Sequence, residues 1–145
     1  MQAASVHDID SVQFVQALSR MRRDGLGFNG RGVDPLPDWL VGAAAHPYLE
    51  PMELNLLRLR KKVAAGADFV LTQAVTDLAG FTRWMDAVRE AELDQQIAII
   101  AGVPADGGGE MAAQLKSVPG VRGIHVFSGG CESLAAGVIQ QAGLS

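Results

Sequence analysis

Residues 61–73, Lys61-Lys62-Val63-Ala64-Ala65-Gly66-Ala67-Asp68-Phe69-Val70-Leu71-Thr72-Gln73, decide the fold of this chain. They read as the end of an amphipathic helix, a glycine stop, a buried strand and a polar pair. Upstream, apolar residues recur at steps of three and four and form one helical stripe, Met52, Leu56, Leu59 and Val63. Gly66 stands where that helix should end, because glycine tolerates a left-handed backbone. Phe69–Leu71 is a continuous apolar run, typical of a parallel strand covered on both faces.

The same unit of strand, loop and helix occurs four times along the chain. The predicted strands are residues 39–44, 69–74, 97–103 and 121–127. Strict alternation of strands and helices implies right-handed crossovers and a parallel sheet. We therefore predict an α/β fold, the parallel half of a TIM-barrel-like (β/α)8 fold with four strands alternating with helices. A complete barrel takes about 250 residues, so we expect the 145 residues to form a single half-barrel domain, 1–145.

Helices are predicted from their caps and their apolar spacing. Asp10 or Ser11 caps a first helix whose apolar face is Phe14, Leu18 and Met21. Thr76 or Asp77 caps another, whose buried face is Leu78, Phe81, Met85 and Val88. Two further helices follow the glycine loops 107–109 and 128–130. The arginines that end the first helix are interpreted as cations that complement a helix C-terminus, Arg20, Arg22 and Arg23.

Composition excludes several classes of protein. The net charge of −4 and the pI near 5.2 argue against nucleic-acid binding, which requires a basic surface. The chain contains no apolar run of the roughly 18 residues that a membrane span needs. The start of the chain has no signal-peptide pattern, and the single cysteine, Cys131, fits a reducing compartment, so we expect a cytoplasmic protein. Histidine and cysteine show no zinc-binding spacing, and no metal site is predicted.

Two groups of polar residues are candidates for a binding site. Asn55, Arg58 and Lys62 form a second stripe on the helix that ends at Gly66. Arg58 and Lys62 lie one turn apart and can grip a diphosphate, unless the stripe is simply a solvated helix face. Gln73 follows a strand, and α/β folds bind ligands at the carboxyl ends of their strands. Its amide offers a donor and an acceptor, either to a ligand or to the backbone of the loop.

With these residues in view, the chain resembles the methylenetetrahydrofolate reductase family. The resemblance runs nearly end to end but covers only the C-terminal half of the family's barrel. It rests on the order and spacing of short segments, which are residues 7–12, 42–47, 59–69, 72–73, 100–103 and 121–125.

The resemblance implies a barrel with FAD at its carboxyl-end face. Reduced flavin there passes a hydride to 5,10-methylenetetrahydrofolate and gives 5-methyltetrahydrofolate. Gln73 matches the family's glutamine that hydrogen-bonds the folate pterin. The positions matching FAD contacts are His7, Asp8, His46, Asn55, Arg58, Lys61 and Lys62.

The resemblance also implies that parts of the family's site are missing. The family's acidic residue on the first barrel strand and its Arg-Gly-Asp near the fourth strand have no counterparts here. The family's arginine for the folate glutamate tail falls at Cys131. No catalytic residue is therefore assigned, and we expect the isolated chain to be inactive until an N-terminal half completes it.

Two other functions fit the same pattern. A four-stranded parallel sheet leaves two free edges and an open inner face, which promote self-association. The chain is then a non-catalytic folate- or flavin-binding module that pairs as a homodimer or with a partner subunit. Alternatively, the loops 107–109 and 128–130 hold a phosphate ester, because such barrels commonly bind phosphate there.

Overall fold

A computed structural model describes residues 9–143, so the predicted site residues His7 and Asp8 lie outside the described residues. In chain order the described elements are α1 (Ser11–Asp24), β1 (Gly42–Ala45), α2 (Met52–Ala64), β2 (Phe69–Ala74), α3 (Leu78–Glu90), β3 (Ala98–Pro104), α4 (Gly108–Leu115), β4 (Val121–Phe127) and α5 (Glu132–Gln141). The strands lie in the order β1-β2-β3-β4, and every neighbouring pair is parallel. The predicted α/β fold, a partial TIM-barrel-like arrangement of four parallel strands alternating with helices, is confirmed.

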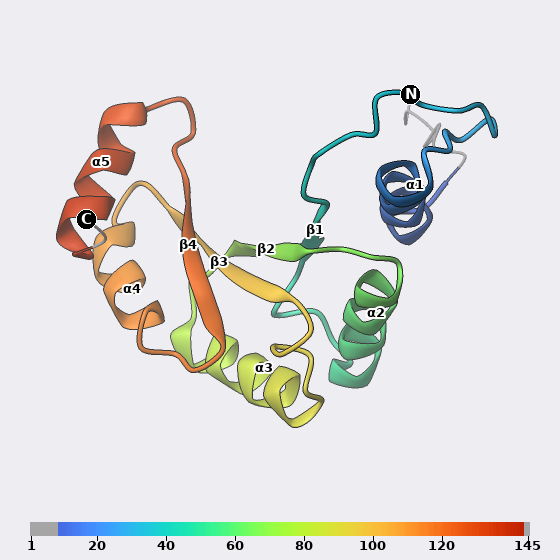
Figure 1. Cartoon of the computed structure of the whole chain (residues 1–145). Coiled ribbons are helices and arrows are strands. Elements are labelled where there is room, and N and C mark those ends of the chain that lie inside the picture. Colours follow the sequence, from blue (N-terminus) through green and yellow to red (C-terminus); the bar gives the residue numbers. More distant parts are fainter. Residues whose placement is uncertain (1–8, 144–145) are drawn as a thin grey trace, which may run out of the picture.

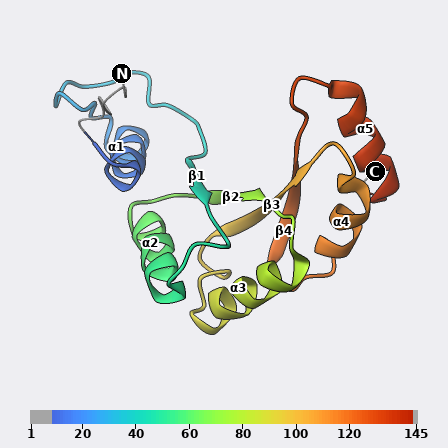
Figure 2. The same ribbon diagram turned by 180° about the vertical axis from the view of Figure 1, so that it is seen from behind.

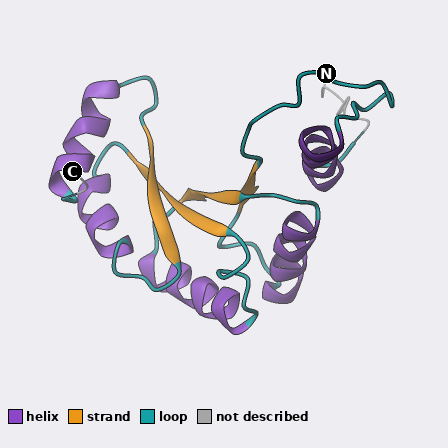
Figure 3. Cartoon of the chain, in the orientation of Figure 1, coloured by secondary structure: helices purple, strands orange, loops and turns teal. Residues whose placement is uncertain are grey.

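The helices are gathered on one face of a curved sheet (Figure 1). Viewed from behind, they form an arc from α1 beside β1 to α5 beside β4 (Figure 2), and no described helix covers the other face (Figure 3). The core lies between the sheet and this arc, and its fully buried strand residues include Val70, Ile99, Ala101 and Val103. No described helix is long and apolar enough to cross a membrane.

The third helix supplies the largest part of the core. Asp77 caps it by accepting a hydrogen bond from the Ala79 N–H at 3.0 Å. The predicted buried face is confirmed, because Phe81, Met85 and Val88 are completely buried and Leu78 packs against them, and Trp84 is buried as well.

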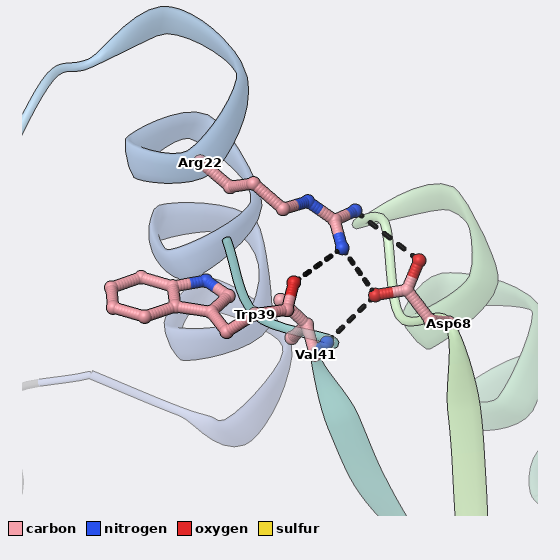
Figure 4. Close-up of polar contacts among 4 residues, drawn as sticks. All are labelled: Arg22, Trp39, Val41 and Asp68. Atoms are coloured by element: carbon pink, nitrogen blue, oxygen red, sulfur yellow. Dashed lines mark hydrogen bonds and ion pairs between the residues drawn. The ribbon is translucent and has the colours of Figure 1, made fainter. Parts of the chain in front are cut away.

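The first strand begins later than predicted, at Gly42 rather than at residue 39. Two of the backbone groups just before it bond to side chains, while the Val41 carbonyl accepts a hydrogen bond from the Asp68 N–H at 2.8 Å. The Trp39 carbonyl accepts a hydrogen bond from Arg22 at 2.9 Å, and the Val41 N–H donates to the Asp68 carboxylate at 2.7 Å (Figure 4). Arg22 and Asp68 also form a two-pronged ion pair, at 2.6 and 3.2 Å. Arg22 thus ties α1 to the entrances of β1 and β2, which the helix-end interpretation did not predict.

The first helix packs through small residues. Asp10 caps it as predicted, accepting from the N–H groups of Val12 and Gln13, both at 2.8 Å. The predicted apolar face is only partly right, because Phe14 is 48% exposed while Val15 and Ser19 are buried. A Cβ on Gly66 would lie 2.2 Å from the Ser19 Oγ, so the end of α2 approaches α1 too closely for a larger side chain. Gly66 also has the left-handed backbone expected of it, with φ of 96°.

Candidate functional site

A pocket of about 300 Å³ lies at the carboxyl ends of β1 and β2, beside α2. Its lining residues are Ser11, Ala44, Ala45, His46, Leu49, Asn55, Arg58, Leu59, Lys62 and Gln73. The structure therefore brings together most of the predicted site residues, from the loop after β1, from α2 and from the end of β2. Lys61 is exposed and does not line this pocket.

Helical spacing explains why α2 contributes several polar side chains to one pocket. Asn55, Arg58 and Lys62 follow each other at steps of three and four residues, so they lie along one face of the helix. The same face also carries Leu59, which is 3% exposed and anchors α2 in the core. The pocket wall is therefore attached rigidly to the fold.

Asn55 holds the loop that follows β1. Its side chain is buried, and its amide nitrogen donates to the carbonyl oxygens of His46 at 2.9 Å and Leu49 at 3.1 Å. An amide nitrogen has two hydrogens, and both are used in these bonds. In this conformation Asn55 therefore offers a ligand only its oxygen, and its main effect is to place His46, whose side chain is exposed at the pocket rim.

Two cations meet at the pocket without an acidic partner among its lining residues. The Lys62 ammonium group donates a hydrogen bond to the Ala44 carbonyl at the end of β1. Burial lowers the pKa of Lys62, and the nearby charge of Arg58 lowers it further. Like charges one helical turn apart repel each other. An anion bound between Arg58 and Lys62 would relieve that repulsion, so the pocket is chemically suited to a phosphate or diphosphate.

Gln73 lines the pocket from the end of β2, and this residue is exposed. Tyr48, which sequence reasoning did not select, stabilises the loop after this strand. Its hydroxyl donates to the Asp77 carbonyl at 3.0 Å and accepts from the N–H groups of Thr76 and Asp77, both at 3.2 Å. No local pattern identifies this role, because it depends on the approach of two loops.

The glycine loops after β3 and β4 do not line this pocket. In the first loop, Gly108 and Gly109 are buried, and a Cβ on Gly109 would lie 2.0 Å from the Gln141 Oε1. Gly109 therefore allows α4 and α5 to pack closely, which is a structural reason for this glycine. Among residues 9–143, no three His, Cys, Asp or Glu side chains are grouped so that they could hold a metal ion.

The residues of the pocket fit one part of a flavin dinucleotide. Arg58 and Lys62 suit its phosphates, Gln73 offers an amide, and Leu49 and Leu59 supply apolar walls. A volume of about 300 Å³ is at the lower end of the range for ligand pockets, which extends to roughly 1,000 Å³. The pocket thus fits a segment of a large cofactor, and the remainder needs surface beyond these residues.

Comparisons with known proteins match the part of the chain that forms the pocket. A family model described as methylenetetrahydrofolate reductase matches residues 30–127, which contain all four described strands and every pocket residue except Ser11. A curated relative, methylenetetrahydrofolate reductase 2 of Saccharomyces cerevisiae, is 35% identical over 69 residues. That alignment covers 43% of this chain and 11% of the yeast protein, so the chain spans only a small part of that relative's length.

Proposed function

Because this chain belongs to the methylenetetrahydrofolate reductase family, we propose that it forms a flavin- and folate-binding part of such an enzyme. In this proposal, FAD is the cofactor and 5,10-methylenetetrahydrofolate is the substrate, which is reduced to 5-methyltetrahydrofolate. The reaction requires an N-terminal half that completes the barrel. Bound FAD supplies the hydride, and the residues of this chain bind and orient the two ligands.

The observation that carries the proposal is the pair of cations at the pocket, one turn apart on α2. Arg58 and Lys62 bind the diphosphate of the cofactor by charge-assisted hydrogen bonds, which are stronger than neutral ones. Gln73 lines the same pocket and binds the polar edge of the pterin through its donor and its acceptor. The carboxyl-end position of the pocket agrees with the place where parallel α/β folds bind ligands.

The test is a titration of the purified chain with FAD, followed by flavin absorbance and fluorescence. Arg58→Gln should lower FAD affinity about tenfold, because it removes a charged hydrogen bond to the phosphates. Arg60→Gln is the matched control, since Arg60 is exposed on the same helix and does not line the pocket. Riboflavin, which has no phosphate, should bind the wild type and Arg58→Gln equally weakly.

Two results would count against the flavin assignment. One is a chain that retains no flavin on a sizing column, with or without a supplied N-terminal half. The other is an equal loss of FAD affinity in Arg58→Gln and Arg60→Gln, which would indicate unspecific attraction of an anion to a basic helix.

A second candidate function is a binding module that pairs with another copy of itself. The uncovered sheet face favours it (Figure 2). Side chains alternate between the two faces of a strand, so the neighbours of the core residues lie on this face, namely Phe69, Leu71, Ile100 and Phe127. Two copies supply the eight strands of a closed barrel, with β4 of each copy beside β1 of the other. The side chains of the two edge strands differ in size, because β4 ends in Phe127 while β1 carries only glycine and alanine. A dimer that binds folate or flavin without reducing folate would support this candidate.

A further inference from the structure

We infer that Thr72 is a positioning residue whose buried hydroxyl fixes a bulge in β2 and thereby presents Gln73 to the pocket. The inference rests on the proposed function, in which Gln73 binds folate. Thr72 itself faces the helices, is 1% exposed and does not line the pocket. It therefore acts on a ligand only through its neighbour.

The pairing of β2 with β3 becomes irregular at this point. Leu71 pairs with Ile100, but the next pair is Ala74 with Gly102, so β2 advances three residues while β3 advances two. An extra residue on one strand is a β-bulge, and bulges redirect side chains. The burial pattern shows the same change. Val70 and Thr72 face the core two residues apart, but the next residue that is buried, Val75, comes three residues later.

The Thr72 hydroxyl replaces the strand-to-strand bonds that the bulge interrupts. Its Oγ1 accepts a hydrogen bond from the Gly102 N–H at 2.9 Å and donates one to the Gln73 carbonyl, also at 2.9 Å. Regular pairing resumes at the Val75 N–H, which donates to the Gly102 carbonyl at 2.8 Å. One side chain thus satisfies a buried donor on β3 and orients the backbone of Gln73.

The partner strand is also adapted to the bulge. A Cβ on Gly102 would lie 2.7 Å from the Thr72 carbonyl oxygen and 2.5 Å from the ring of Phe127. Only glycine therefore allows β3 to approach β2 this closely. Without the hydroxyl, the buried Gly102 N–H would lack a hydrogen-bond acceptor, which is energetically unfavourable. Regular pairing of β2 with β3, without the bulge, would restore an acceptor. Loss of the bulge would shift the residues that follow it by one position, which turns Ala74 and Val75 to the opposite faces of the sheet. The backbone of Gln73 would then lose its fixed path at the pocket.

The experiment compares Thr72→Val, which keeps the shape but removes the hydroxyl, with Thr72→Ser, which restores it. Affinity is measured with 5-methyltetrahydrofolate and with FAD, and the hydrogen exchange of the Gly102 amide is followed by NMR. Thr72→Val should weaken folate binding about fivefold, change FAD affinity little and accelerate Gly102 exchange. Thr72→Ser should resemble the wild type. Thr82→Val is the stability control, because the Thr82 hydroxyl donates to the Leu78 carbonyl within α3, away from the pocket.

The outcomes separate this inference from the proposed function. If the wild type binds no folate, the proposed function of Gln73 fails, but Gly102 exchange and the Gln73 side-chain amide signals still report on the bulge. Changes in both signals in Thr72→Val, and not in Thr72→Ser, support the inference. Unchanged Gly102 exchange in Thr72→Val overturns it, whether or not folate affinity falls. A folate affinity of Thr82→Val as low as that of Thr72→Val also overturns it, because the loss then follows stability alone.

Discussion

The ammonium group of Lys62 is held half-buried beside the guanidinium group of Arg58, with the Ala44 carbonyl as its hydrogen-bond acceptor. Burial of a charge and repulsion between like charges both disfavour the folded state. Residues that lower stability in this way are common at binding sites, where the ligand supplies the missing partner. Lys62 is therefore a residue at which stability and binding should respond to substitution in opposite directions.

We expect Lys62→Met to lower FAD affinity about tenfold while the free energy of unfolding at neutral pH stays equal or rises. Methionine keeps the length of the side chain without the charge. The pKa of Lys62 is lowered in the folded state by burial and by Arg58. The unfolded state therefore binds the proton more tightly, and wild-type stability should rise as pH increases toward the ordinary lysine pKa of about 10.4. Lys62→Met should lack this rise.

Urea unfolding at neutral and alkaline pH, together with FAD titration at neutral pH, measures both effects. Arg60→Met is the control for loss of a cation on the same helix, and it should keep the alkaline rise. A Lys62→Met variant that is less stable than the wild type throughout this pH range would show that the bond to Ala44 outweighs the charge penalty.

At the scale of elements, α1 is attached to the sheet through Arg22 and Asp68 (Figure 4). The hydrogen bond from Arg22 lowers the pKa of Asp68 most strongly, and the Val41 N–H lowers it further. Both side chains remain about 30% exposed, so solvent weakens the ion pair. The network nevertheless joins three segments that are distant in sequence. Substitutions in it can therefore show how much it contributes to the attachment of α1.

Asp68→Asn should lower the free energy of unfolding at neutral pH by about 1 kcal/mol, the value of a typical hydrogen-bonded contact. The stabilisation of the wild type should be fully present above the ordinary aspartate pKa of about 3.9. It should disappear as the pH falls through the lower folded-state pKa. Asp24→Asn removes an exposed pair with Arg23 on the same helix and should leave stability unchanged. Equal effects of the two substitutions, measured by urea unfolding, would refute a structural role for Asp68.

The sequence pattern correctly predicted those helices and strands whose boundaries and buried faces follow from the spacing of their own apolar residues. The strands β2 and β4 occur where continuous or alternating apolar residues placed them, and α3 buries its predicted face. The start of β1 was wrong, because Asp68 and Arg22 bind the backbone of the preceding residues. These partners come from other segments, so no pattern within residues 39–45 contains this information.

The same distinction applies to the pocket. Arg58, Lys62 and Gln73 line one pocket. The sequence predicted this, from the helical spacing of the two cations and from the position of Gln73 at the end of a strand. The use of both Asn55 amide hydrogens within the chain depends on the path of the loop after β1. The roles of Tyr48 and Thr72 depend on contacts between segments, which only the folded chain shows.

For the whole molecule, the uncovered face of the sheet is the main physical problem. Parallel sheets in α/β proteins are normally covered on both faces, whereas here the described helices cover one (Figure 2). Phe127 is 41% exposed at the β4 edge, and its ring centroid lies 4.7 Å from that of His125 in an edge-to-face contact. Such a surface should gain from burial against a complementary half-barrel, and a second copy of the chain offers one.

We expect the purified chain to form dimers, and Phe127→Lys to shift their dissociation constant upward by at least about tenfold. A lysine at this position would bring a charge into the closed barrel, and burying an unpaired charge is strongly unfavourable. Leu134→Lys is the matched control, because Leu134 has a similar exposure of 46% but lies on α5, on the helical side of the sheet. Light scattering on a sizing column over a range of concentrations measures the mass of each variant, and circular dichroism verifies that each is folded.

A wild type that is monomeric at every concentration would rule out the second copy and leave a separate N-terminal half as the partner to test. Equal dissociation of both variants would place the interface on the helices instead of the open sheet.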